Sequence, residues 1–199
     1  MEAEPLKNLA DINALHRVLT RWGNVREAEC LIIGCNFALR ISDLLSITVE
    51  QSQQDTITLN EQKTGKFKSF PINTPAKKAI GRLLYWYRSQ GIKPDYLFQG
   101  TGNRAKKLIQ PISSRHLNNK LKEAAESIGL DISISSHSMR KSFGYHAYMK
   151  GTDIRYLQAL FNHKTEFQTL TYIGVTRKTV QDVYLNSFID VSEPREKTL

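Results

Sequence analysis

The sequence has only two cysteines, Cys30 and Cys35, and no long hydrophobic run. Their spacing matches no zinc site, and we expect buried free thiols in a reducing compartment. The longest apolar run, Cys30–Leu39, is interrupted by Gly34 and Asn36 and falls well short of the roughly 18 residues of a membrane span. The acidic N-terminus lacks the basic and apolar regions of a signal peptide. These absences predict a cytoplasmic protein.

Acidic residues are also scarce, with 19 Asp and Glu against 28 Lys and Arg, a formal net charge of +9. Asp153, Asp182 and Asp190 are scattered, so a two-metal nuclease would lack its carboxylate cluster. The histidines outside the motifs described below have no ligand-like spacing, and we expect no metal and no cofactor. The positive charge favours a polyanionic partner, most commonly nucleic acid.

The length of 199 residues and the 40% hydrophobic content predict one domain with a sizeable core. Apolar residues recur every three or four positions, which predicts helices. The expected helices lie at about 6–22, 24–39, 75–90, 113–128, 138–149, 153–160 and 176–189, with a short helical segment at 166–171. Asn24 is expected to cap the second helix in a capping box with Glu27, and Arg40 to emerge near its C-terminal end.

The hydrophobic period changes to two after Ile47. Residues 56–60 and 67–72 alternate, and the turn between them contains Gly65, which predicts a β-hairpin. With a third strand at 47–51, the expected fold class is mainly α with a small three-stranded antiparallel sheet (α+β). Residues 100–105 are expected to form a flexible basic loop.

Polar residues capable of phosphodiester chemistry follow one another in three segments. Arg40 lies in residues 38–45 (ALRISDLL), and Lys63 lies in the hairpin turn. His137 and Arg140 stand three apart at the start of a helix, which places both side chains on one face. Ser135 or Ser136 is expected to cap that helix. His163 is followed nine residues later by Tyr172.

Residues 38–45, 137–143 (HSMRKSF) and 160–172 resemble the three signature motifs of the tyrosine recombinases, the phage integrase family. Their order and spacing match, as does Lys63, and the resemblance covers residues 28–189. It implies the catalytic-domain fold of that family and a site-specific DNA recombinase of the integrase or invertase type. The family usually has Gly where this chain has Asn162, and Asn tolerates the left-handed backbone conformation.

The resemblance also implies a role for each residue. Tyr172 attacks the scissile phosphate and forms a 3′-phosphotyrosine, Arg40 and Arg140 bind the non-bridging oxygens, and Lys63 protonates the leaving 5′-oxygen. With three cations present, neither metal nor ATP is required.

Three further roles follow from the same resemblance. His137 assists proton transfer at the nucleophile, and His163 hydrogen-bonds the phosphate. Asp43 orients Arg40 or the His137 region. Basic residues near these motifs are expected to contact DNA: Lys66, Lys68, Arg104, Lys106, Lys107, Arg115 and Lys141.

The partners implied are double-stranded DNA and further copies of this chain, forming a tetramer on paired sites, with an accessory DNA-bending protein possible. We divide the chain into a lead helix (1–27), a catalytic domain (28–190) and a flexible tail (191–199). Two alternatives stay open: a DNA-binding regulator without strand exchange, and a type IB topoisomerase-like relaxing enzyme. The sequence also leaves open a naturally minimal recombinase or a catalytic fragment, and whether the last helix docks on its own or a neighbouring protomer.

Overall fold

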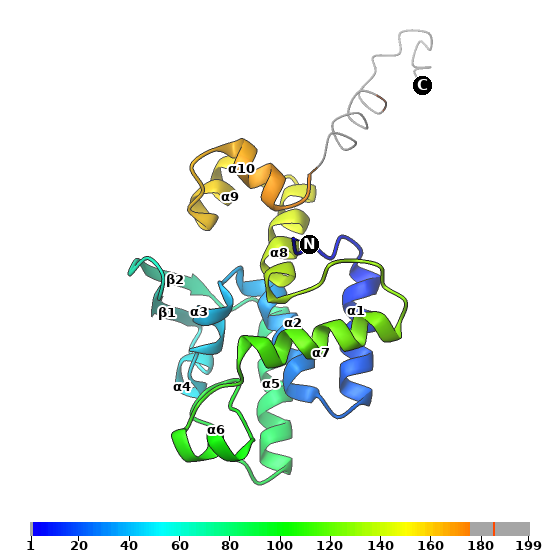
Figure 1. The fold of residues 1–199 in the computed structure, drawn as a ribbon. Coiled ribbons are helices and arrows are strands. Elements are labelled where there is room, and N and C mark those ends of the chain that lie inside the picture. Colours follow the sequence, from blue (N-terminus) through cyan, green and yellow to red (C-terminus); the bar gives the residue numbers. More distant parts are fainter. Residues whose placement is uncertain (1, 176–184, 186–199) are drawn as a thin grey trace, which may run out of the picture.

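The computed structural model describes residues 2–175 and 185, which form a mainly helical fold beside one small sheet (Figure 1). The helices of this part are α1 (Leu9–Arg21), α2 (Val25–Phe37), α3 (Ile41–Leu45), α4 (Val49–Ser52), α5 (Thr74–Ser89), α6 (Asn103–Leu108), α7 (Ser114–Ser127), α8 (Ser136–Met149), α9 (Ile154–Phe161) and α10 (Glu166–Tyr172). None of the described helices combines the length and apolarity needed to cross a membrane.

Helix α2 lies at the centre of the fold and packs against α1, α5 and α8 (Figure 1). Cys30, Leu31 and Ile33 are fully buried because this helix is apolar on most sides. The helices predicted from periodicity within residues 6–160 are confirmed, with ends shifted by at most three residues. The predicted helix at 176–189 and the tail at 191–199 lie outside the described residues, apart from Leu185.

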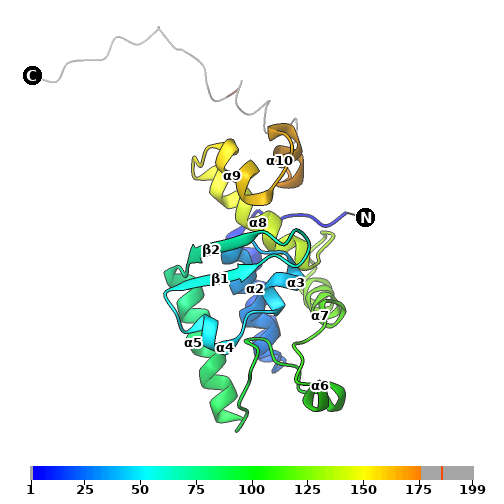
Figure 2. The ribbon, with the colours of Figure 1, turned by 90° about the vertical axis from the view of Figure 1, so that its left-hand side faces the viewer.

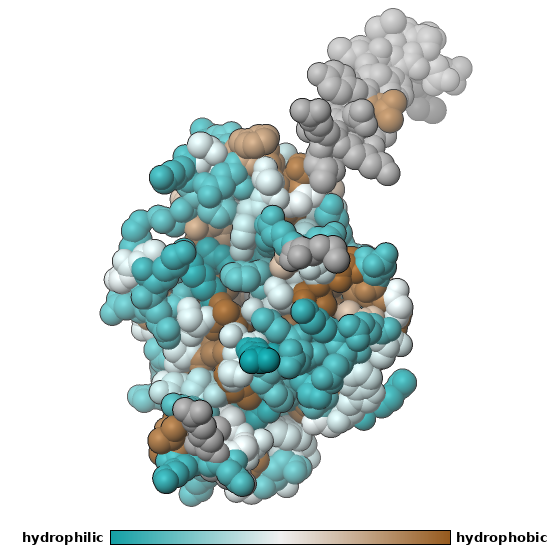
Figure 3. Space-filling model, viewed as in Figure 1, coloured by the Kyte–Doolittle hydropathy of each residue, from teal (hydrophilic) through white to brown (hydrophobic). Residues whose placement is uncertain are grey.

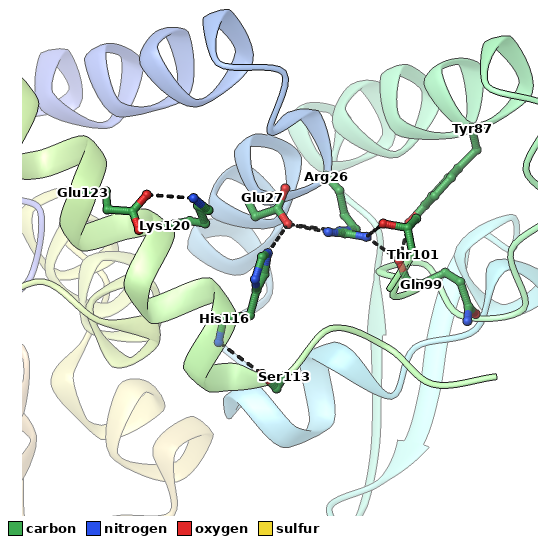
Figure 4. Close-up of polar contacts among 9 residues, drawn as sticks. All are labelled: Arg26, Glu27, Tyr87, Gln99, Thr101, Ser113, His116, Lys120 and Glu123. Atoms are coloured by element: carbon green, nitrogen blue, oxygen red, sulfur yellow. Dashed lines mark hydrogen bonds and ion pairs between the residues drawn. The ribbon is translucent and has the colours of Figure 1, made fainter. Parts of the chain in front are cut away.

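The predicted capping box at the start of α2 is wrong. Asn24 makes no side-chain hydrogen bond to the helix. Arg26 and His116 lie against Glu27 and engage its carboxylate, with Nη2 and Nε2 respectively 2.6 and 2.8 Å from Oε1 (Figure 4). Arg26 also donates to the carbonyl of Gln99 at 2.7 Å. The network therefore ties α2 to α7 and to the segment before α6.

The sheet contains two strands in the described residues, β1 (Thr56–Asn60) and β2 (Phe67–Pro71). They pair antiparallel, with Thr56 opposite Pro71, and Gly65 takes a positive φ in the turn. The predicted third strand at 47–51 is wrong, because most of that segment belongs to α4. Thr48 is the N-cap of this helix. Its hydroxyl accepts a hydrogen bond from the backbone N of Gln51, and the Gln51 side chain accepts one from the backbone N of Thr48, a capping box that favours a helical turn.

The predicted loop at 100–105 is also partly wrong, because α6 begins at Asn103. The sequence between Gly102 and Pro111 is too short to show a helical hydrophobic period, so periodicity could not reveal this element. Helix α6 lies at the end of the molecule away from α9 and α10 (Figures 1 and 2).

A second, smaller core lies under α9 and α10, which sit together at one end of α8 (Figures 1 and 2). Leu157, Phe161 and Ile173 are almost completely buried there, and Tyr172 packs against them. The chain segment before α1 lies against α8, where the hydroxyl of Ser142 accepts a hydrogen bond from the backbone N of Leu6 at 2.8 Å. Lys7 reaches the carbonyl of Gly174 at 2.8 Å. Residues at opposite ends of the chain therefore fix the end of α10.

Candidate active site

A cavity of about 490 Å³ lies where the hairpin turn, α3, α8, α9 and α10 meet. Six of the seven residues predicted to be catalytic line it. They are Arg40, Lys63, His137, Arg140, His163 and Tyr172. The cavity therefore gathers groups separated by up to 132 positions along the chain.

Arg40 lies close after the C-terminal end of α2, as predicted, and is the N-cap residue of α3. Ala38 takes a left-handed conformation, with φ 53° and ψ 25°, and ends α2 two residues earlier. The Arg40 guanidinium pairs with Glu61, with Nη1 2.8 Å from Oε2. This turn of the backbone aims Arg40 toward the hairpin.

Arg140 lies one turn after His137 on α8 and is 4% exposed. Its guanidinium donates hydrogen bonds to the carbonyls of Ala38 and, at 3.4 Å, Phe161, and lies 4.8 Å from the centre of the Phe161 ring. Burial lowers the pKa of Arg140, with an additional contribution from the charge of Arg40. A guanidinium stays protonated even so, and this one is fixed in place before any ligand arrives.

His137 lies in the first turn of α8, where Ser135 is the N-cap, as one of the two predicted alternatives. The Ser135 hydroxyl accepts a hydrogen bond from the backbone N of His137 at 3.2 Å. Desolvation by the surrounding protein lowers the pKa of His137, and the charges of Lys141 and Arg140 lower it further. The imidazole is therefore neutral at pH 7 and can accept a proton.

His163 follows Asn162, which ends α9 in the left-handed region with φ 56° and ψ 46°. The predicted tolerance of Asn for this conformation is confirmed. The Nδ1 atom of His163 lies 3.2 Å from the hydroxyl of Thr169, a residue buried in α10, which leaves Nε2 for a ligand. Burial lowers the pKa of His163, as do the charges of Arg140 and Arg40, so this ring is also neutral at pH 7.

Tyr172 is the last residue of α10 and is half-buried. Its ring centre lies 4.9 Å from that of His163 and 5.3 Å from that of Phe161. Burial raises the pKa of the Tyr172 phenol, although the charge and hydrogen bond of Arg140 act in the opposite direction. The phenol is therefore protonated at pH 7, and a nucleophilic role requires a base to take its proton.

The three lysines of the hairpin have different environments. Lys63 lines the cavity from the exposed turn. The ammonium of Lys66 donates to the side-chain oxygen of Asn162 at 2.6 Å, which joins the hairpin to the end of α9. Lys68 Nζ is buried without a hydrogen-bond partner, and burial lowers its pKa, with a further contribution from the charge of Arg140. Lys68 is thus half-buried with a buried ammonium group, and its predicted contact with DNA stays a prediction.

Asp43 is completely buried and does not line the cavity. One carboxylate oxygen accepts a hydrogen bond from the backbone N of Gln62 at 2.9 Å and a weaker one from the hydroxyl of Ser42 at 3.4 Å. The described hydrogen bonds of Asp43 therefore hold the hairpin next to the Lys63 turn and involve neither Arg40 nor His137.

The remaining predicted DNA contacts also differ in their surroundings. Lys141 is 5% exposed, pairs with Glu2 at 2.6 Å, and lies 5.0 Å from the centre of the Tyr172 ring, so it is a buried neighbour of Tyr172. Lys107 and Arg115 are exposed. Arg104 and Lys106 belong to α6. The face drawn in Figure 3 is largely hydrophilic with separated apolar areas.

Motif reasoning missed two residues of the site, Glu61 and Thr169. Glu61 pairs with Arg40, and Thr169 holds His163. Neither stands in a recognisable pattern, and only Thr169, three positions before Tyr172 on the same helix, had a spacing that could have revealed it.

Comparison with known proteins agrees with this geometry. The model of the phage integrase family matches residues 10–179. The "Probable integrase/recombinase YoeC" of Bacillus subtilis (strain 168) is 34% identical over 182 residues, which cover 91% of this chain and 94% of that protein. The "Tyrosine recombinase XerC" of Rickettsia rickettsii (strain Sheila Smith) is 31% identical over 84% of this chain, which spans 53% of that relative.

Solved structures share the fold at low sequence identity. The XerA recombinase aligns over 96% of this chain and 65% of its own, with a TM-score of 0.70 and 16% identity. A lambda integrase dimer bound to a COC′ core site aligns over 99% of this chain and 52% of its own, with a TM-score of 0.65 and 13% identity. The predicted catalytic-domain fold is confirmed, except for the third strand. The chain belongs to the phage integrase family.

Proposed function

We propose that this protein is a site-specific DNA recombinase that breaks and rejoins double-stranded DNA through a phosphotyrosine formed on Tyr172. The observation that carries the proposal is the cavity that Tyr172 shares with two arginines, two histidines and a lysine. A pure DNA-binding regulator has no use for a phenol in this setting, and the family relationship also favours the recombinase.

In the proposed cleavage step, the oxygen of Tyr172 attacks the scissile phosphorus as the bond to the 5′-oxygen breaks. The phenol proton passes to a neutral imidazole, for which His137 is the assigned acceptor. His163, in the tautomer that carries its proton on Nε2 and accepts from Thr169 at Nδ1, donates a hydrogen bond to the phosphate. Lys63 gives a proton to the leaving 5′-oxygen. Each bond broken is matched by one formed, so the DNA can be resealed by reversing the same steps.

Arg40 and Arg140 are proposed to stabilise the charge that develops on the non-bridging oxygens. Arg140 is held by two backbone carbonyls, so its guanidinium does not have to reorganise during the reaction. Preorganised donors of this kind contribute about 3–4 kcal/mol each in other enzymes. Because these cations stabilise the developing charge, we propose that cleavage needs no metal. Because the phosphotyrosine link retains the energy of the phosphodiester, we propose that rejoining needs no ATP.

We further propose that strand exchange occurs in a tetramer on paired DNA sites in the bacterial cytoplasm or nucleoid, with or without an accessory DNA-bending protein. A tetramer distinguishes a recombinase from a topoisomerase, which relaxes DNA without pairing sites. We retain residues 28–190 as the proposed catalytic domain. The contacts of residues 2–8 with α8 and Gly174 favour treating 1–27 as part of that domain.

The test uses nicked suicide substrates drawn from a pool of host and element-junction DNA, in excess EDTA. Wild-type protein is expected to form an SDS-resistant adduct, and Tyr172→Phe is expected to bind DNA with nearly unchanged affinity without forming one. Tyr156→Phe is the matched control, since Tyr156 is 74% exposed and does not line the cavity. An adduct with Tyr172→Phe contradicts the nucleophile assignment, and loss of the adduct in EDTA contradicts metal independence.

A further inference from the structure

The side chain of Glu61 lies beneath the candidate site at the end of β1 and is 6% exposed as a residue. Its Oε2 atom accepts a hydrogen bond from the hydroxyl of Thr64 at 2.6 Å and lies 2.8 Å from Nη1 of Arg40. Its Oε1 atom lies 3.7 Å from Nζ of Lys68. One carboxylate thus contacts Arg40, β2 and the turn that carries Lys63.

The Glu61 carboxylate is ionised in this environment. Burial alone would raise its pKa, but the hydrogen bond from Thr64 and the contacts with Arg40 outweigh burial, and the pKa is lowered. A buried charge is tolerated when it is paired, and breaking such a pair leaves its partner uncompensated. Arg40 and Glu61 therefore stabilise each other's position in the free protein.

Glu61 also offsets part of the positive charge of the site. Arg40, Arg140 and Lys68 interact electrostatically with one another and with the carboxylates of Glu61 and Asp43. Without Glu61 the same cations would repel one another more strongly.

We propose that Glu61 is a positioning residue for strand cleavage, which fixes Arg40 and the Lys63 turn relative to each other so that both reach the same phosphate. The proposal rests on the proposed function and adds a residue that lies outside the three signature motifs. Glu61 acts through Arg40, Thr64 and Lys68, and does not itself touch DNA.

The experiment compares Glu61→Gln with wild type in two measurements, the dissociation constant for DNA and the rate of adduct formation at saturating DNA. Glutamine keeps the size and an acceptor for Thr64 but loses the charge that holds Arg40 and Lys68. The rate is expected to fall by about 100-fold, the effect of a misplacement near 1 Å, while the dissociation constant changes by less than about threefold. Glu50→Gln, an exposed position on α4, changes the net charge equally and is expected to leave both unchanged.

Glu61→Asp provides rescue, because it keeps the charge and shortens the side chain by one methylene. It is expected to recover about tenfold of the lost rate. Thermal unfolding followed by circular dichroism checks that each variant is folded. If Glu61→Gln is unfolded, the DNA dissociation constant and the rate of adduct formation of Glu61→Asp are compared with those of wild type instead. Adduct formation by Glu61→Gln at the wild-type rate overturns the proposal, as does a loss confined to DNA affinity.

A readout on the free protein separates failure of this inference from failure of the proposed function. Modification of Arg40 by phenylglyoxal, followed by mass spectrometry, is expected to be faster in Glu61→Gln because the guanidinium is released. Unchanged reactivity shows that Glu61 does not hold Arg40 and overturns the positioning role. If wild type forms no adduct while the reactivity of Arg40 still responds to Glu61, the proposed function fails and the ion pair stands only as a structural contact.

Discussion

Replacing Gly144, which does not itself line the cavity, by alanine should displace the proposed nucleophile. Gly144 lies on α8, where an added Cβ would be 2.6 Å from Cγ2 of Ile173 and 2.7 Å from Cε2 and Cζ of Phe161. Real Cβ atoms essentially never approach that closely, so the neighbours must move. Ile173 is 0% and Phe161 1% exposed, so the second core surrounds both side chains, and Phe161 also lines the cavity.

The expected cost in stability follows from two opposing terms. Overpacking a closed core costs about 1–3 kcal/mol. Alanine in place of glycine within a helix stabilises the folded protein by about 0.5–1 kcal/mol, because glycine loses more backbone entropy on folding. Thermal or denaturant unfolding of Gly144→Ala should therefore show a net loss of up to about 2.5 kcal/mol, with a central value of about 1 kcal/mol. Gly81→Ala is the control, since its Cβ on α5 meets nothing within 4 Å, and it should gain about 0.5–1 kcal/mol.

The effect on cleavage should exceed the effect on binding. Ile173 follows Tyr172 directly, and Phe161 precedes the Asn162–His163 pair, so the shift reaches both the proposed nucleophile and the residue proposed to bind the phosphate. At saturating DNA, the rate of adduct formation should fall by about 100-fold. DNA affinity should change little, because the exposed lysines and arginines are untouched. A Gly144→Ala protein with wild-type stability and cleavage rate would refute the close packing between α8 and the Tyr172 segment.

Two further predictions concern the chemistry of the cavity. Arg140→Lys should reduce the rate of adduct formation at saturating DNA by at least about 100-fold, near 3 kcal/mol, because an ammonium cannot replace a planar guanidinium that bonds both Ala38 and Phe161 and also clamps phosphate. A rate close to wild type would contradict the clamp. Burial and the charges of Lys141 and Arg140 lower the pKa of His137, the proposed proton acceptor, from the 6.5 of a free imidazole, so the cleavage rate should fall to half its plateau only below pH 6.5, as acidification protonates this ring. A rate that has already halved at pH 7, measured in single-turnover experiments, would show that His137 is not the group that titrates.

Local sequence patterns determined much of the helical framework. The apolar periods predicted most helices of the described chain because each period marks one buried face, and that relation depends on nearby residues alone. The motif order identified the family and six of the residues that line the cavity. Patterns failed where local contacts compete, as at Thr48, whose capping bond to Gln51 made a helix from an expected strand, and where an element was as short as α6.

Only the tertiary structure decided which ion pairs and hydrogen bonds the polar residues of the site form. Lys68 and Lys141 look like surface lysines in the sequence, yet the ammonium of Lys68 is buried, and Lys141 is buried and pairs with Glu2 of the N-terminal segment. The carboxylate of Asp43 accepts a hydrogen bond from the hairpin residue Gln62 and does not bond Arg40. The guanidinium of Arg40 pairs with Glu61, which belongs to none of the motifs. Sequence spacing fixes only which residues lie on the same face of one element. Ion pairs such as Arg40–Glu61 form between elements, so their partners are set by how the hairpin packs beside α3.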